Sequence, residues 1–271
     1  NACPNMPCIN LNGSYECDCR MFQYVHPIYP CKRDQKDKPL LLYITHDDIR
    51  LTNISIYASE SKSNSILYSN LTSGGVIDYN LQNNYIAWSD TKQKTINIAV
   101  MDKAKSSMFS NVNSILIKTN IKYVSGIAVD WIQDLVYWTD RDLNTIEIAA
   151  VNNWNNERAV LIDGLSQPMN IALNVDQSLM VFIHWGVKPK IEIAAQDGSD
   201  RKIIVEKHLL WPTGLTIDLN VNRIYWIDEK LNAIFACDYD GRHRVEIVAS
   251  DLYLKHSSSI IIFEKTIYWA S

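Results

Sequence analysis

The sequence has no excess of basic residues and no long apolar run. Its 26 Lys and Arg residues stand against 30 Asp and Glu residues, which gives a net charge of -4 and a pI of about 5.9. Because binding to a phosphate backbone requires many neutralising cations, this balance argues against nucleic acid as a partner. A membrane-spanning helix needs about 20 apolar residues, and the run Ile260–Phe263 is far shorter. We therefore expect no membrane segment within these residues.

The sequence also lacks a secretory leader and the motifs of common enzymes. Residues 1–5 have neither the charged nor the apolar region of a signal peptide, so any leader is expected outside this chain. Catalysis requires convergent acid, base or metal groups. There is no nucleophile elbow and no HExxH, and no carboxylate pair recurs outside the repeat described below. We interpret the chain as non-enzymatic.

Cysteine is scarce beyond the first 31 residues. Cys237 stands alone, and the other five cysteines are Cys3, Cys8, Cys17, Cys19 and Cys31. Such density is typical of a small disulfide-stapled module from an oxidising compartment. A zinc site would need His partners or paired CxxC motifs, and the only nearby histidine is His26. With no partner in the rest of the chain, Cys237 is predicted to be a buried free thiol on an inner strand.

What the sequence does contain is a repeat. The stretch 126–140, GIAVDWIQDLVYWTD, ends in Tyr137–Asp140, and variants of these four residues return along the chain. They begin at residues 87, 137, 181, 225 and 268, so the intervals are 50, 44, 44 and 43 residues. A period of this length is that of one four-stranded propeller blade.

Each period contains four short runs rich in β-branched and aromatic residues. In one period they are Ile127–Val129, Leu135–Trp138, Thr145–Ile148 and Arg158–Ile162. Asp-Gly turns follow the third run at residues 197 and 240 and the fourth run at residue 163. One such sheet cannot bury both of its faces, so the sheets are expected to pack side by side around a channel. The sequence predicts an all-β protein with a β-propeller.

Residues 1–35 resemble an epidermal-growth-factor-like (EGF-like) module. The last four cysteines of this module, with Gly13–Tyr15 before the second, are matched in order and spacing by Cys8, Cys17, Cys19 and Cys31. The resemblance implies that Cys3 pairs with Cys17 and that Cys19 pairs with Cys31. It leaves Cys8 unpaired in this chain, so its partner is expected upstream and the chain is expected to be a piece of a longer one.

The same stretch resembles the calcium-binding subtype of that module. In this subtype an Asn or Asp at the position of Asn10 supplies one oxygen ligand. A calcium ion takes six to eight oxygens, and the other side-chain ligands of the subtype precede its first cysteine, outside this sequence. The resemblance therefore implies calcium only for the intact module, and the alternative is that Asn10 is a turn residue.

After a charged linker, residues 36–271 resemble the YWTD, or class B, propeller of the low-density lipoprotein receptor family. Leu41–Arg50 resembles its opening strand pair, and Trp211–Gly241 contains the closest match. The resemblance implies a six-bladed propeller that directly follows an EGF-like module. We therefore expect a partial module over 1–35 and a propeller over 36–271, with five blades and part of a sixth.

The repeated aromatic and acidic positions are interpreted as structural. A pattern present in every blade serves every blade, by packing a ring between sheets and anchoring a turn with a carboxylate. We assign this role to Trp88, Asp90, Tyr137, Trp138, Asp140, Tyr225, Trp226 and Asp228. His184 replaces the aspartate in one repeat and is interpreted as structural rather than as a metal ligand or base. The alternative for the aromatic positions is direct binding, since Trp and Tyr favour interfaces.

The family resemblance implies an ectodomain of an endocytic receptor that binds a protein or lipoprotein ligand. In the resembled receptor, the propeller docks at acid pH onto the ligand-binding repeats of the same receptor and displaces lipoprotein. The residues of that surface match Trp131, Trp185 and His256, whereas the second histidine position holds Asn232. Histidine, with an ordinary pKa of about 6.5, gains charge between the cell surface and an endosome. These three residues form our candidate acid-pH interface.

The resemblance further implies a cell-surface protein that cycles through endosomes and is anchored by segments outside this chain. Three sequons suit glycosylation of such an ectodomain, at Asn12, Asn53 and Asn70. The alternative function is a matrix or signalling module. Nidogen-like proteins and the Wnt co-receptors hold a protein ligand on one face of a similar propeller.

Overall fold

The computed structural model describes residues 8–11, 14–17, 40–53, 64–80, 82–100, 114–151, 157–263 and 266–271. The chain divides into two compact units, Asn1–Leu42 with Leu51–Ser65 and Tyr43–Arg50 with Ile66–Ser271. The predicted boundary at residue 36 lies outside the described residues, as do Cys3, Asn12, Cys19 and Cys31. Only the backbone is described for Cys8, Asn10, Cys17 and Asn53.

The first unit contains one described hairpin within the predicted EGF-like module. Strand β1 (Cys8–Leu11) pairs antiparallel with β2 (Ser14–Cys17), and the Cα atoms of Cys8 and Cys17 lie opposite each other. The hairpin thus lies between two of the cysteines on which the resemblance rests. The disulfide pairing and the calcium ligand remain predictions.

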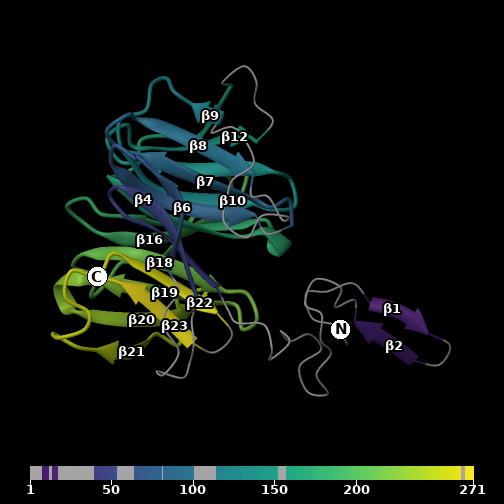
Figure 1. The fold of residues 1–271 in the computed structure, drawn as a ribbon. Helices are drawn as coiled ribbons and strands as arrows, with labels where there is room; N and C mark the ends of the chain where they lie inside the picture. Colours follow the sequence, from purple (N-terminus) through teal and green to yellow (C-terminus); the bar gives the residue numbers. More distant parts are fainter. Residues whose placement is uncertain are drawn as a thin grey trace. The chain divides into compact units, whose positions relative to one another are not determined.

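From residue 40 onward the chain folds into consecutive antiparallel sheets, the blades of a β-propeller (Figure 1). The first blade has three strands, β3 (Leu40–Ile44), β4 (Asp48–Asn53) and β5 (Asn64–Ser69). The second has β6 (Gly74–Asn80), β7 (Tyr85–Asp90), β8 (Thr95–Val100) and β9 (Ser114–Ile117). The third has β10 (Val124–Asp130), β11 (Leu135–Asp140), β12 (Thr145–Ala150) and β13 (Ala159–Ile162).

The later sheets repeat this order. The fourth blade has β14 (Pro168–Asn174), β15 (Leu179–His184), β16 (Lys190–Ala195) and β17 (Lys202–Val205). The fifth has β18 (Pro212–Asp218), β19 (Arg223–Asp228), β20 (Ala233–Asp238) and β21 (Val245–Ala249). Strands β22 (Ser259–Phe263) and β23 (Thr266–Ala270) form a two-stranded sheet. Two short 3-10 turns, Val175–Gln177 and Glu229–Leu231, complete the described elements.

The all-β propeller prediction is therefore confirmed with five blades, while the predicted partial sixth blade stays a prediction. Every described blade follows chain order, so each strand pairs with the next strand along the sequence. Among the described residues, no helix has the length and apolar character needed to cross a bilayer.

The first strands of consecutive blades lie side by side and begin at the same end. Strands β6, β10, β14, β18 and β22 contact one another in that order. Ser125 near the start of β10 donates its hydroxyl to the carbonyl of Pro168 at the start of β14, at 2.7 Å. Thr213 in β18 donates likewise to Ser257, just before β22, at 3.0 Å. We call the end where these strands begin the entry face and the opposite end the exit face.

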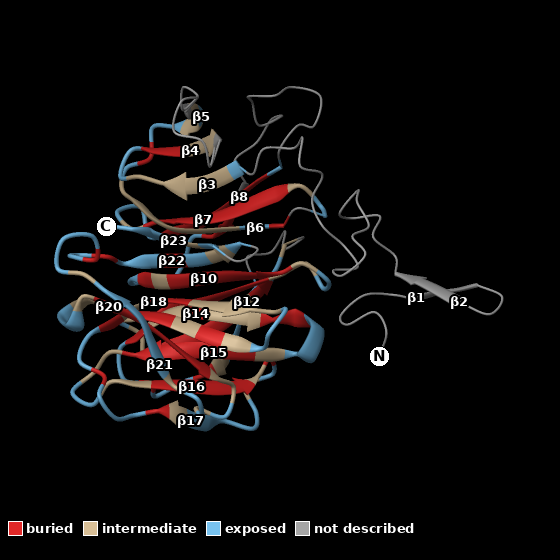
Figure 2. Cartoon of the chain, turned by 90° about the horizontal axis from the view of Figure 1, so that it is seen from below, coloured by how far each residue is buried: buried red, intermediate tan, exposed pale blue. Residues whose placement is uncertain are grey.

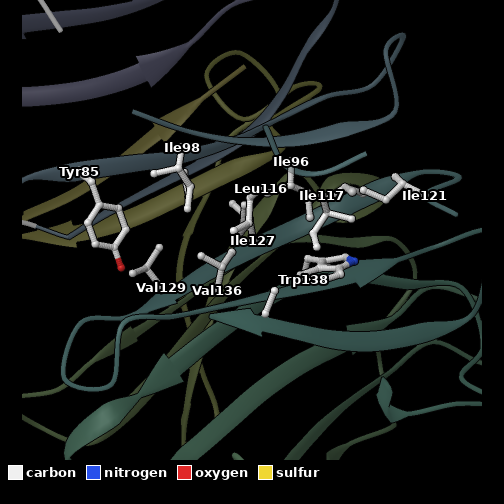
Figure 3. Packing of buried hydrophobic residues seen from close by; sticks show 13 residues of the cluster. Tyr85, Ile96, Ile98, Leu116, Ile117, Ile121, Ile127, Val129, Val136 and Trp138 are labelled. Carbon is white, nitrogen blue, oxygen red and sulfur yellow. The ribbon is translucent and has the colours of Figure 1, made fainter. Parts of the chain in front are cut away.

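Apolar side chains fill the space between neighbouring blades. Between the second and third blades, Ile96, Ile117 and Val136 are fully buried, and Figure 3 shows them beside Tyr85 and Trp138 in one cluster. Figure 2 shows strands such as β7, β10, β15 and β16 as mainly buried and many of the loops as exposed. Because both faces of a blade are covered, its second strand is almost continuously apolar. Each such aliphatic side chain contributes about 2 kcal/mol to folding.

The Asp-Gly turns that follow the third strand pack closely against the outer strand of the preceding blade. Gly198 and Gly241 have φ values of 87° and 79°, which only glycine adopts without strain. A Cβ on Gly241 would lie 2.1 Å from the carbonyl oxygen of Ile204, in the outer strand of the fourth blade. A Cβ on Gly198 would lie 2.8 Å from that of Leu161 in the third blade. Each turn therefore needs glycine for its conformation and for the close approach.

Cys237 is a free, buried thiol on an inner strand of its sheet, as the sequence predicted. It belongs to β20, the third strand of the fifth blade, and packs in the apolar cluster with Ile224 and Phe235. Burial raises the pKa of this thiol to about 12. The apolar pattern indicated burial correctly, because third strands are as well covered as first strands.

Strand β6, the first strand of the second blade, has an aspartate at a position where the first strands of the next three blades have small side chains. Asp78 in β6 accepts the backbone N–H of Val129 in β10 at 2.7 Å. The matching positions of the other blades, from their register with the second strands, are Ala128, Ala172 and Thr216. Burial raises the pKa of Asp78 to about 6, although the hydrogen bonds from Val129 and Tyr79 oppose the shift.

We expect Asp78→Asn to stabilise the protein at pH 7.5 but not at pH 4. Above its unfolded pKa of about 3.9, the wild-type acid ionises more readily in the unfolded chain than in the folded one. The stability that protonated Asp78 contributes to the folded state is therefore fully present below its unfolded pKa and is lost as the pH rises through about 6. Urea unfolding should show a gain of about 2 kcal/mol at pH 7.5. The exposed Asp163→Asn is the matched control, and an equal gain by Asp78→Asn at both pH values would contradict the assignment.

Candidate functional site

An aspartate at the end of the second strand holds two entry-face loops together. In the third blade, Asp140 accepts the backbone N–H groups of Lys122 and Tyr123, at 2.8 and 3.1 Å, from the loop before β10. It also accepts those of Asp142 and Leu143, at 3.1 and 3.0 Å, from the loop after β11. The carboxylate is completely buried. It therefore serves as a cap for both loops.

Asp90 and Asp228 repeat this arrangement at the same sequence spacings. Asp228 accepts the N–H groups of Leu210, Trp211 and Leu231, at 2.7, 3.0 and 3.3 Å. Asp90 accepts four such bonds, from the loop before β6 and the loop after β7. Burial raises the pKa of Asp90, but the hydrogen bonds it accepts outweigh this and leave the pKa below its ordinary value. The cap is therefore a charge-assisted one.

His184 occupies the cap position of the fourth blade. Its Nδ1 lies 3.3 Å from the backbone N–H of Ser166 and accepts from it, at the 18-residue spacing used by the aspartates. Its Nε2 lies 3.3 Å from Glu192, which also binds Lys190 and, at 2.8 Å, Arg201. Burial raises the pKa of Glu192, but the hydrogen bonds from His184, Lys190 and Arg201 hold it well below its usual range. His184 thus replaces one capping bond and ties the loop to the third strand.

The repeated aromatic residues lie in the core rather than on a surface. Trp88, Trp138 and Trp226 are at most 1% exposed, and Tyr137 is 3% exposed. Tyr225 is partly buried. The three tryptophan rings and the Tyr137 ring are not available to a ligand, which favours their structural interpretation over binding. Within the described part of the chain, no three His, Cys, Asp or Glu side chains gather as a metal site.

Exposed apolar side chains lie on the entry face of the fourth and fifth blades and of the sheet formed by β22 and β23. The exposed fraction is 100% for Val187, 77% for Leu252, 66% for Tyr253, 49% for Leu210 and 45% for Trp211. They come from the loop after β15 and from the loops before β18 and β22. Large apolar side chains exposed together on one face make that face a candidate interaction site. We call these five residues and Trp185 the aromatic sector.

Contacts between neighbouring loops hold this sector in place. The ring centroids of Trp185 and Trp211 are 6.4 Å apart, and the ammonium of Lys230 lies 4.9 Å from the Trp211 ring. His256 Nδ1 lies 3.2 Å from Glu229 Oε1. The Trp185–Trp211 and Glu229–His256 contacts each join the loop after a second strand to the loop before the next blade. The side chains are thereby positioned on a capped framework before any ligand arrives.

The structure brings together only part of the predicted acid-pH interface. Trp185 and His256 both lie on the entry face, and the side chain of His256 is 73% exposed. Trp131 follows the end of β10 and lies on the exit face, where its carbonyl accepts a bond from Asn80 at 3.4 Å. A seven-residue strand at about 3.3 Å per residue separates the two faces by roughly 20 Å. Trp131 therefore does not share a surface with the other two residues.

Sequence reasoning assigned no role to Trp211, Leu252 or Tyr253. Each lies in the loop that precedes a first strand, the least regular part of the repeat. The available signal was positional, because these loops carry bulky apolar residues where a solvated loop is expected to be polar. Asn70, a predicted glycosylation site, is also exposed on this face, before β6.

Residues 179–219 match the low-density lipoprotein receptor repeat class B. The chain is 28% identical over 274 aligned residues to the vitellogenin receptor Yl of Drosophila melanogaster, covering 97% of this chain and 13% of that protein. It is 31% identical over 186 residues to the vitellogenin receptor of Solenopsis invicta, covering 69% of this chain and 10% of that protein. The chain thus spans only a small part of the length of these relatives.

A shorter human protein and two solved structures are also similar. The human low-density lipoprotein receptor-related protein 5-like protein is 28% identical over 187 residues, covering 69% of this chain and 70% of that protein. A chain in the nidogen/laminin complex has a TM-score of 0.74 at 20% identity, with 85% and 84% of the two chains covered. An auxiliary nutrient binding protein of Bacteroides thetaiotaomicron has a TM-score of 0.63 at 12% identity, with 84% and 62% covered. These structural likenesses concern the fold.

We expect Asp140→Ala to destabilise the protein by about 3 kcal/mol, because it leaves backbone N–H groups of two loops without their charged acceptor. Chemical denaturation of the purified chain measures this loss. Asp142→Ala, which removes an exposed carboxylate two residues away, should change stability by less than about 0.5 kcal/mol. Equal effects of the two variants would contradict the capping role.

Proposed function

Since this chain carries a YWTD propeller of the low-density lipoprotein receptor family, we propose that it is a non-enzymatic extracellular segment of an endocytic receptor that binds a protein ligand on its entry face. The observation that carries the proposal is the aromatic sector. Its side chains are exposed, apolar and prearranged, as the central residues of a protein-binding surface are.

The ligand class follows from the relatives. Two of them are named vitellogenin receptors, and the chain aligns with one of these over nearly its whole length. We therefore propose a yolk-type or lipoprotein ligand, with the ligand-binding repeats of the same receptor as a second partner at acid pH. A cell-surface location, cycling through endosomes, belongs to this proposal. The membrane anchor would lie outside these residues.

Acid release would depend on the entry face alone. His256 stands 3.2 Å from Glu229 and close in sequence to Lys255 and Asp251. Protonation of His256 would add a positive charge beside the aromatic sector and would favour an acidic partner there. Trp185 belongs to the same surface, whereas Trp131 is too distant to contribute. Calcium bound through Asn10 and glycans on the three sequons remain part of the proposal for the intact module.

The second candidate is a matrix or signalling module. It is favoured by the fold shared with a chain of the nidogen/laminin complex and by the human receptor-related relative. The same entry face would then hold a matrix protein or a growth-factor antagonist. The two candidates differ in ligand rather than in surface, so a panel of ligands separates them.

We expect Trp211→Ser to weaken binding of purified vitellogenin to the 271-residue chain by about tenfold or more, as loss of a central interface tryptophan does. Trp131→Ser, which alters the same residue type on the exit face, should leave the affinity unchanged. Surface plasmon resonance at neutral pH measures both. The proposed surface would be wrong if the two variants lost affinity equally or if neither did. Binding of a laminin fragment in place of vitellogenin would support the second candidate.

A separate experiment tests the proposed release of the ligand at acid pH. We expect wild-type complexes formed at neutral pH to dissociate faster at about pH 5.5, and His256→Ala to slow that dissociation in the intact receptor. Release that is unchanged in His256→Ala would remove this residue from the mechanism. It would leave the Trp211 result intact.

A further inference from the structure

The entry face has a second sector whose chemistry differs from the first. On the second and third blades, the loops 91–94, 118–123 and 141–144 carry five cationic residues and one acidic residue. The acid is Asp142, and the cations are Lys92, Lys94, Lys118, Lys122 and Arg141. This local excess of positive charge stands on a chain whose net charge is -4. We call the five cations the basic sector.

The three loops lie next to one another. Ile96 follows the first loop and Ile121 lies in the second, and both belong to the same buried cluster. The second and third loops are joined by Asp140, which accepts N–H groups from both of them. The cations therefore converge on one region rather than being spread around the molecule.

The charges of this region are available to a ligand. All four lysines are exposed, and within the described part of the chain none of them pairs with a carboxylate. Arg141 lies 4.0 Å from the Tyr123 ring and 3.2 Å from Asp142. The acids beneath the loops, Asp90 and Asp140, are buried and already accept backbone N–H groups. Their negative charges reduce the net positive charge of the region, but their buried oxygen atoms are not accessible to a ligand.

Acidic side chains precede and follow the basic sector along the chain, and they also occur in turns of the exit face. Asp47 on the first blade precedes the region along the chain, and Asp163, directly after the outer strand of the third blade, follows it. On the exit face, the turns between first and second strands at 82–84, 131–134, 175–178 and 219–222 carry two acids and no Lys or Arg. These exit-face turns would repel a long polyanion, whereas the basic sector would attract it.

The kind of partner follows from what the basic sector lacks. A protein interface needs apolar groups at its centre, but the only exposed large apolar side chain in these loops is Tyr123, whose ring is covered by Arg141. Clustered, unpaired lysines without apolar neighbours instead match a chain of regularly spaced sulfates. We propose that the basic sector binds a sulfated polysaccharide of the heparan type, beside the protein ligand on the aromatic sector.

This inference is independent of which protein ligand the aromatic sector takes. The two sectors occupy different blades of one face, so both ligands can be held together. A sulfated chain on the second and third blades would raise the local concentration of any protein that binds the same polysaccharide. The gain is one of effective concentration, without a new protein contact.

The test uses a heparin-derived oligosaccharide as probe and the 271-residue chain as receptor. We expect binding that weakens steeply with added NaCl, because cations on bound polyanions are released. Replacing the four lysines in Lys92→Gln, Lys94→Asn, Lys118→Gln and Lys122→Gln together should weaken binding about tenfold or more and flatten the salt dependence. Asn is chosen at 94 because Lys94 has a φ of 56°, which Asn tolerates.

The matched control removes four exposed lysines elsewhere, in Lys188→Gln, Lys202→Gln, Lys207→Gln and Lys255→Gln, and should keep most of the affinity. Equal loss in both variants would show non-specific attraction and would overturn the site. Binding of poly-glutamate as tight as that of the oligosaccharide would assign the sector to an acidic protein instead. Failure of the wild-type chain to bind the oligosaccharide at physiological salt would also overturn the proposal. Unfolding curves of both variants establish that each is folded.

Discussion

The framework of this propeller depends on a buried acceptor at the end of the second strand, which the described residues show in the second to fifth blades. The acceptor takes N–H groups that no strand partner can satisfy, from a loop before the blade and a loop after the strand. Without it, those groups would be buried and unpaired, at a cost that exceeds the net value of a typical hydrogen bond. Three blades use an aspartate and one uses His184. Conservation of the geometry therefore matters more than identity of the residue.

The same caps explain why the entry face can carry different chemistry on each blade. The residue 17 positions before a capping aspartate gives its N–H to the cap and keeps its side chain for the surface. That residue is Ser73, Tyr123 and Trp211 in successive aspartate-capped blades. A constant backbone contact thus supports a variable side chain, which is how one repeat can serve a lysine-rich region and an aromatic one.

Most of the fold could be predicted from the sequence, because its signals are local and repeated. The interval between copies of Tyr137–Asp140, the four short apolar runs and the Asp-Gly turns indicated blades, and their strands lie where the runs predicted. The burial of Cys237 was predicted as well, because hydrophobicity of the surrounding residues reports burial. The assignment of Trp131 and Trp185 to one surface was wrong, although the repeat could have separated them, because Trp131 follows the first run of its repeat and Trp185 follows the second. The aromatic and basic sectors were missed because each combines loops that are distant in sequence.

The Asp-Gly turns have a consequence for how such a molecule can change. Gly241 leans on the outer strand of the fourth blade and Gly198 on that of the third, so each blade touches its predecessor through a surface unlike the one it offers its successor. Contacts of this kind are heterologous, and they give the stack of sheets a direction. A duplication or deletion of one whole repeat would reproduce every junction that it interrupts. Loss of half a repeat would leave two mismatched junctions, so the complete blade is the unit whose insertion or deletion preserves contacts of this kind.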